Sequence, residues 1–132
     1  MGHVSALPAR IGAHPLRLAD SITEIVADDA GSIVVSGSHG GRSAAGYARA
    51  VPLALAVFND AGVGKDQAGI VALDILDAIG MPSVAVGHRS ARIGDARDTW
   101  DHGVIPFVND AARATGLRAG LRLRDEIVRS FG

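Results

Sequence analysis

The feature that most constrains the fold is a series of short apolar segments, each followed by a loop of glycine and polar residues. These segments are residues 32–36, 53–58, 83–87 and 104–108. Strands that are apolar throughout are buried on both faces, which is typical of parallel sheets covered by helices. The pattern predicts one domain over residues 1–132 with α/β architecture. We expect three α/β/α layers around a small, mostly parallel sheet of four to five strands, flavodoxin-like or Rossmann-like in arrangement.

The segments between these strands have the spacing and end signals of helices. We expect helices over residues 21–30, 42–51, 66–79, 110–116 and 121–131. Residues 88–98 are polar and are expected to form a loop. Residues 1–20 are expected to be an irregular lead-in, because Pro8 and Pro15 interrupt any long helix there.

The composition indicates self-association. Of 132 residues, 48% are hydrophobic and only 20% are charged, and the mean hydropathy is +0.24. A small sheet also leaves strand edges that need cover. We therefore expect a homodimer or a larger homo-oligomer.

Several function classes receive no support. The net charge of −1 and the isoelectric point of about 6.5 argue against partners such as nucleic acid or an anionic membrane. The longest uncharged apolar run, residues 50–59, reaches only about half of a membrane span. No signal-peptide stretch is recognisable, so a cytoplasmic location is expected.

No metal or cofactor is expected either. Cysteine is absent, and the 5 histidines have no recognised ligand spacing. A metal bound by His39, His88, Asp60 and Asp95 at the sheet edge remains an alternative. The glycine spacing does not match a dinucleotide fingerprint, so a redox cofactor is not expected.

The first candidate loop covers residues 36–43. Its consecutive Gly40 and Gly41 allow backbone N–H groups to converge ahead of a helix N-terminus, where an anion or carbonyl oxygen is stabilised. His39 carries an imidazole and is a candidate acid, base or phosphoryl acceptor, with Ser38 beside it as a binding residue. The alternative is a tight turn in which His39 caps the helix or faces solvent.

This segment carries a resemblance to a known family. Its residues Ile33-Val34-Val35-Ser36-Gly37-Ser38-His39-Gly40-Gly41 resemble the phosphate-loop segment of universal stress proteins, which bind adenine nucleotides. The resemblance is limited to these residues, and the longer glycine-spaced pattern of that family is incomplete here. It implies a turn between strand and helix that is suited to phosphate.

The second candidate loop, residues 59–66, contains Asn59, Asp60, Gly62, Gly64 and Lys65. A phosphate-binding Walker loop is excluded, because it needs glycine in the place of Asn59 and serine or threonine at position 66, which is aspartate. Asp60, at the strand end, is the preferred general base. Lys65 is the only lysine among the 13 lysines and arginines, which suggests a specific need for an ammonium group.

The third candidate loop, residues 88–95, contains Ser90, Arg92 and Asp95. An arginine can hold a carboxylate or phosphate through two hydrogen bonds, and Asp95 is placed to orient His88 or His39. Ordinary pairing of surface charges is the alternative reading of these residues.

Right-handed crossovers place all three loops at one edge of a parallel sheet. We therefore predict a small-molecule enzyme that uses acid–base chemistry, a hydrolase, lyase or isomerase, acting on a small anionic or carbonyl ligand. His39, Asp60 and Lys65 are the predicted catalytic residues. A serine triad is disfavoured, because the Gly-x-Ser-x-Gly motif is absent. The alternatives are a non-catalytic nucleotide- or phosphate-binding regulatory module and a structural subunit of a larger enzyme.

Overall fold

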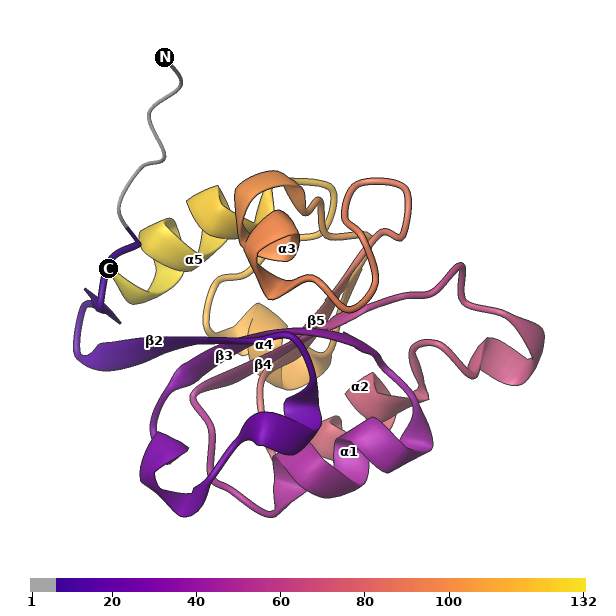
Figure 1. Cartoon of the computed structure of the whole chain (residues 1–132), viewed down its shortest axis with the longest axis horizontal. Helices are drawn as coiled ribbons and strands as arrows, with labels where there is room; N and C mark the ends of the chain where they lie inside the picture. The colour runs from indigo at the N-terminus through magenta and orange to yellow at the C-terminus, as the bar shows by residue number, and fades with distance from the viewer. Residues whose placement is uncertain (1–6) are drawn as a thin grey trace.

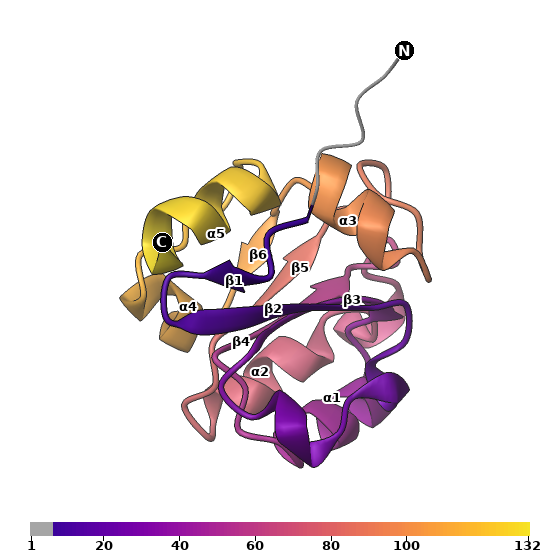
Figure 2. The ribbon, with the colours of Figure 1, turned by 60° about the vertical axis from the view of Figure 1, so that its left-hand side comes forward.

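One mixed sheet forms the centre of the computed structural model, which describes residues 7–132. Within that range six strands lie in the order β1-β2-β3-β4-β5-β6 (Figures 1 and 2). They are β1 (Arg10–Ile11), β2 (His14–Ala19), β3 (Ile33–His39), β4 (Leu55–Asn59), β5 (Ser83–Val86) and β6 (Phe107–Val108). Strands β2 to β5 are parallel, and each outermost strand is antiparallel to its neighbour.

Helices cover both faces of the sheet. They are α1 (Arg42–Arg49), α2 (Val71–Asp77), α3 (Ala96–His102), α4 (Asp110–Ala114) and α5 (Leu123–Phe131). Three short 3-10 turns also occur in the described range, η1 (Ile22–Glu24), η2 (Ala27–Asp29) and η3 (Lys65–Gln67). Helices α1 and α2 pack on one face and α3, α4 and α5 on the other (Figure 2).

Alternating residues of the central strands enter two separate cores. In β3, Val34 packs with the residues of α1 and α2, whereas Val35 packs with Trp100 of α3 and Ile127 of α5. All of these side chains are buried. Because both faces of each central strand are covered, the strands are apolar without alternation, as parallel sheets require. The prediction of an α/β fold with a mostly parallel sheet is confirmed.

The sheet has more strands than the expected four to five, and it begins earlier in the chain. Residues 1–6 lie outside the described range, but β1 and β2 occupy much of the segment expected to be irregular. Pro15 pairs with Arg10 of the outermost strand. Proline is tolerated in β-structure near a sheet edge, where a missing N–H group costs little. Pro15 is therefore compatible with β2, and its presence did not exclude a strand in this segment.

The last expected strand and two expected helices also differ. Residues 104–108 yield only the two-residue β6, which runs antiparallel to β5. Residues 21–30 form η1 and η2, because Ile25 and Val26 between them are extended. Asp66 and Gln67 adopt positive φ, so α2 begins at Val71 and not at residue 66.

The order of the parallel strands does not confirm the flavodoxin-like or Rossmann-like assignment. Strands β2 to β5 follow one another in chain order. The doubly wound folds reverse their strand order at a central switch point, where their ligands bind. A site in this protein must therefore be built from consecutive strand ends.

Candidate acid–base site

The three glycine-rich loops meet at the carboxyl ends of β3, β4 and β5. The Gly94 N–H donates to the Gly37 carbonyl at 2.7 Å, which joins the third loop to the first. The Gly40 N–H donates to the Asn59 carbonyl at 3.0 Å, and the Asn59 side-chain amide donates to the Ala91 carbonyl at 3.0 Å. The second loop is thus fastened to both of its neighbours.

Asp60 is the centre of the polar contacts between the second and third loops. It directly follows β4 and is only 5% exposed. Its Oδ1 accepts the backbone N–H groups of Gly62 at 2.8 Å and of His88 at 3.0 Å. The same oxygen lies 3.1 Å from Nδ1 of the His88 imidazole. Burial of the carboxylate is therefore compensated by donors from two loops.

This geometry determines the tautomer of His88. An ionised carboxylate only accepts hydrogen bonds, so Nδ1 of the imidazole must carry a hydrogen. In the neutral ring Nε2 then has a free lone pair. Within residues 7–132 no hydrogen bond to Nε2 of His88 is present, and 44% of its side chain is exposed. His88 is consequently an oriented imidazole with its basic nitrogen available to a ligand.

The second loop has an unusual backbone. Ala61, Val63, Asp66 and Gln67 have φ values of 50°, 68°, 55° and 58°, and the intervening Gly62 and Gly64 are also positive. Left-handed conformation costs an L-residue about 1–2 kcal/mol. Lys65 lies on the exposed turn η3 at the far end of this loop, which extends away from the sheet at the right of Figure 1. Asp66 does not cap α2, because the cap position is Ile70.

The first loop places His39 at the exposed end of β3. Its register partner is Asn59, and its ring lies against Gly41, where an added Cβ would be 2.7 Å from Nε2. Gly41 is the N-cap of α1 and supplies no side-chain hydrogen bond to that helix. The first-turn N–H groups of α1 are therefore not capped by a side chain at the cap position.

Two predicted binding side chains make internal hydrogen bonds. The Ser38 hydroxyl accepts the N–H of Ile22 at 2.9 Å, at the start of η1. Asn59 is fully buried, and its side-chain oxygen accepts the Ala61 N–H at 2.8 Å. Both side chains hold the loops in place, and a contact with substrate stays a prediction for them.

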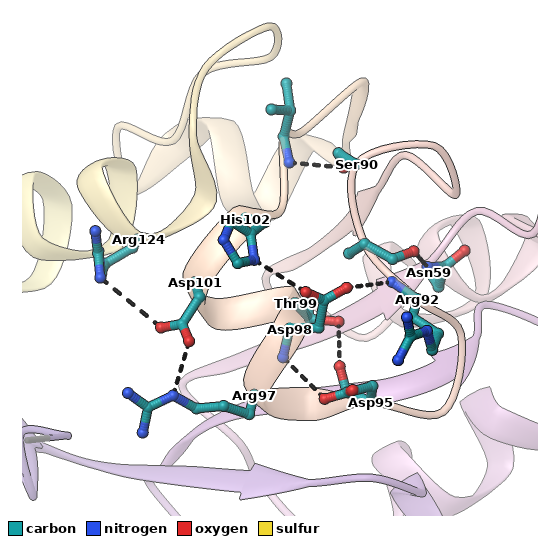
Figure 3. A network of polar contacts seen from close by, with 12 residues as sticks. Asn59, Ser90, Arg92, Asp95, Arg97, Asp98, Thr99, Asp101, His102 and Arg124 are labelled. Atoms are coloured by element: carbon teal, nitrogen blue, oxygen red, sulfur yellow. Dashed lines mark hydrogen bonds and ion pairs between the residues drawn. The ribbon is translucent and has the colours of Figure 1, made fainter. Parts of the chain in front are cut away.

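The predicted binding residues of the third loop take part in the network drawn in Figure 3. The Ser90 hydroxyl donates to the Gly87 carbonyl at 2.7 Å and accepts the Val104 N–H at 3.0 Å. Asp95 caps α3 by accepting the Asp98 N–H at 2.9 Å, so it orients neither His39 nor His88 by a hydrogen bond in the described structure. The loop is thereby held against α3.

Asp98 connects Arg92 to α3. Its carboxylate accepts the Arg92 N–H at 2.7 Å and lies 2.9 Å from Nδ1 of His102 (Figure 3). The hydrogen bond from the Arg92 backbone, followed by that from His102, lowers the pKa of Asp98. The Arg92 side chain is exposed. Its backbone is thus fixed while its guanidinium faces solvent beside the loop.

The predicted catalytic and binding residues did not include His88, which the sequence placed with Asp60 only in the alternative of a metal site. Asp60 is the first residue after β4, and His88 is the second residue after the adjacent parallel strand β5. Strand ends at neighbouring positions in a parallel sheet bring such side chains together. That position was a signal for considering His88, but His39 ends the other neighbour of β4, so the sequence did not decide between the two.

Broader comparisons add no assignment. In residues 7–132, histidine, aspartate and glutamate form no group of three or more suited to a metal ion. No helix in the same range has the length and apolar content needed to cross a membrane. Searches of protein-family models, curated proteins and solved structures gave no match to this chain.

Proposed function

We propose that Asp60 and His88 form the acid–base centre of a small-molecule enzyme, a hydrolase, lyase or isomerase. The observation that carries this proposal is the hydrogen bond between a buried carboxylate and Nδ1 of a half-exposed imidazole, at 3.1 Å. A carboxylate in this position holds the ring in one orientation and tautomer. It leaves Nε2 as the group that exchanges a proton with the substrate.

In the proposed reaction, Nε2 of His88 removes a proton from a water molecule or from a carbon next to a carbonyl group. The Nδ1–H bond to Asp60 is retained, so the carboxylate stabilises the positive charge that develops on the ring. The imidazolium then returns the proton to the leaving group or to the product. Proton transfer of this kind contributes about 10²–10⁴-fold to a rate.

The surrounding groups favour an anionic or carbonyl substrate. His39, Lys65 and Arg92 are exposed, one on each of the three loops, and the first turn of α1 follows a cap residue, Gly41, that supplies no side-chain hydrogen bond. Positive charge and N–H donors stabilise the oxyanion that forms when a carbonyl compound loses a proton or is attacked by water. In this proposal His88 takes the role of base that was predicted for Asp60 or His39, and Asp60 orients its ring. Lys65 remains a predicted stabiliser of oxyanion charge.

The experiment is an activity screen with matched variants. Small 2-oxo acids, hydroxy acids and activated esters would be offered to the wild type, and any turnover compared with His88→Gln and Asp60→Asn. His102→Gln is the control, because His102 also bonds an aspartate, Asp98, at 2.9 Å but lies on the surface of α3. We expect a loss of at least about 100-fold for His88→Gln and no change for the control. Retained turnover in His88→Gln would refute the assignment.

A second candidate is a module that binds a phosphate-bearing ligand without transforming it. It is favoured by the first turn of α1, which follows Gly40 and has no side-chain cap from Gly41. Thermal-shift measurements with adenine nucleotides, inorganic phosphate and small carboxylates distinguish the two, because a ligand stabilises the folded state that binds it. Stabilisation by nucleotides alone, without turnover of any carboxylate, would favour the binding module.

A further inference from the structure

The loop of residues 61–68 closes on itself at a narrow neck. At the neck, the Gly69 N–H donates to the Val63 carbonyl at 2.7 Å. A Cβ atom on Gly69 would overlap the carbonyl oxygen of Asp60, so the two ends of the loop are in direct contact. Compact loops with adjoining ends can move as units, separately from the elements that they connect.

The backbone of this loop is unfavourable by itself. Ala61, Val63, Asp66 and Gln67 all adopt positive φ, and Val63 carries a β-branched side chain, for which this conformation is rare. Every residue from 61 to 68 except Val63 is exposed, so little burial compensates the strain. Such a conformation persists only where other contacts impose it.

Two of the contacts that impose it come from Asp60, beside the bond from the Ala61 N–H to the Asn59 side chain. The Asp60 carboxylate accepts the Gly62 N–H at 2.8 Å, and the Asp60 carbonyl accepts the Val63 N–H at 2.6 Å. The carboxylate oxygen that holds Gly62 is the same one that holds Nδ1 of His88. A Cβ on Gly62 would lie 3.6 Å from Cε1 of that ring, so the loop borders the imidazole.

We propose that the Asp60 carboxylate is the latch of this loop and that residues 61–68 are released as a unit when the latch is lost. Release relieves the backbone strain and uncovers the side of the His88 ring that faces Gly62. The opening and the orientation of His88 thus depend on one oxygen atom. This inference does not require catalysis at His88.

The chain provides a specific probe of loop opening. Lys65 is the only lysine in the chain, so a lysine-specific endoproteinase has one cleavage site, within the loop. Cleavage of a folded protein requires local opening, and its rate follows the open population when closing is fast. The rate of cleavage of the purified protein therefore measures how often the loop of residues 61–68 opens.

The comparison uses three variants of the full chain. Asp60→Ala removes the acceptor, and we expect cleavage at Lys65 to be about tenfold faster, the effect of losing one hydrogen bond to a charged group. Asp60→Asn retains an oxygen acceptor and should fall between Asp60→Ala and the wild type. Glu126→Gln, on α5, is the control for destabilisation elsewhere and should leave the rate unchanged. A rise of less than threefold in Asp60→Ala would overturn the proposal.

Amide hydrogen exchange of the wild type tests the inference even if Asp60→Ala fails to fold. Release as a unit predicts that the amides of Ala61, Gly62, Val63 and Gly69 exchange through one common opening. Their protection factors should then agree within about tenfold. A wider spread among these amides would show that the loop frays residue by residue and would overturn the proposal.

Discussion

Asp60 and His88 share a hydrogen bond of 3.1 Å, yet the carboxylate side chain is 8% exposed and the imidazole is 44% exposed. The buried partner can therefore orient the ring while the exposed partner meets a ligand. The remaining histidine–aspartate pair with a close contact in the described range, His102 with Asp98, has both side chains more exposed, at 63% and 31%. The difference in burial separates the two pairs physically, because a hydrogen bond shielded from water holds its geometry more strongly.

The first prediction concerns the tautomer of His88. Since Nδ1 donates to Asp60, the neutral ring should carry its hydrogen on Nδ1, whereas the Nε2–H form is usual for a free histidine side chain. Nitrogen-15 NMR of the imidazole measures this directly. In Asp60→Ala the preference should disappear. Finding the Nε2–H form in the wild type would contradict the proposed base.

The second prediction concerns Asn109, which is buried at the start of α4. Its oxygen accepts the N–H groups of Ser83 and Ala112 at 3.0 and 2.8 Å, and its NH₂ group donates to the carbonyls of Leu73 and Met81 at 3.1 and 2.9 Å. Asn109→Ala leaves these groups without their partner. We expect a loss of about 2–4 kcal/mol in the free energy of unfolding, measured with urea.

The control for Asn109 is its neighbour Asp110, which is exposed and pairs with Arg113 on the surface. Asp110→Ala should cost less than about 1 kcal/mol, because exposed ion pairs contribute little. Equal losses in the two variants would show that Asn109 does not connect α2, β5 and α4 as described.

The third prediction compares two glycines. A Cβ on Gly37 would lie 2.7 Å from the Cα of Gly94, so Gly37→Ala should separate β3 from the third loop and cost about 1–3 kcal/mol. Gly46 lies inside α1 with nothing near its Cβ position. Gly46→Ala should stabilise the protein by about 0.5–1 kcal/mol through helix propensity. Urea denaturation checks both, and stabilisation by Gly37→Ala would contradict the packing.

The fourth prediction is a pH dependence of stability from Glu126, which is buried on α5. Hydrogen bonds from Arg118 and then Arg129 lower the pKa of Glu126 from 4.5 to about 2. Because the pKa in the folded state is below the unfolded value, the stabilisation is complete above about pH 4.5. It is lost as the pH falls towards 2.

We expect Glu126 to contribute about 1–3 kcal/mol, reduced by the solvent exposure of the two arginines. Denaturation curves of the wild type and Glu126→Gln should differ most above pH 5 and converge towards pH 2. A constant difference across this range would show that the charge of Glu126 is not responsible.

The sequence pattern was sufficient for the central strands and most of the helices. Residues 32–36 and 83–87 were recognisable because covered strands must be apolar on both faces. The helix expected over residues 110–116 was recognisable from its end signals, and the Asn109 side chain caps it by accepting the Ala112 N–H. These signals are local, so they can be read from short stretches of chain.

Elements that depend on distant partners were missed. β2 contains Pro15 and alternates apolar residues with polar ones, and it is stabilised as a strand by its pairing with β3. α3 begins after Asp95 within the segment expected to be a loop, and burial of Trp100 against the sheet stabilises it. A short helix with few apolar residues is decided by tertiary packing and not by propensity.

The sequence alone determined that parallel strands end in polar, glycine-rich loops. Strands buried on both faces are apolar throughout and turns are rich in glycine, so both are recognisable from short stretches of residues. Only the tertiary structure decided which side chains from those loops meet. Asp60 pairs with His88 and not with His39, because the His88 backbone N–H also donates to the Asp60 carboxylate whereas the His39 ring lies against Gly41. The sequence also did not predict the strained loop of residues 61–68 beside Asp60 and His88. The positive φ of Val63 is imposed by hydrogen bonds to Asp60 and Gly69, and not by the residue type.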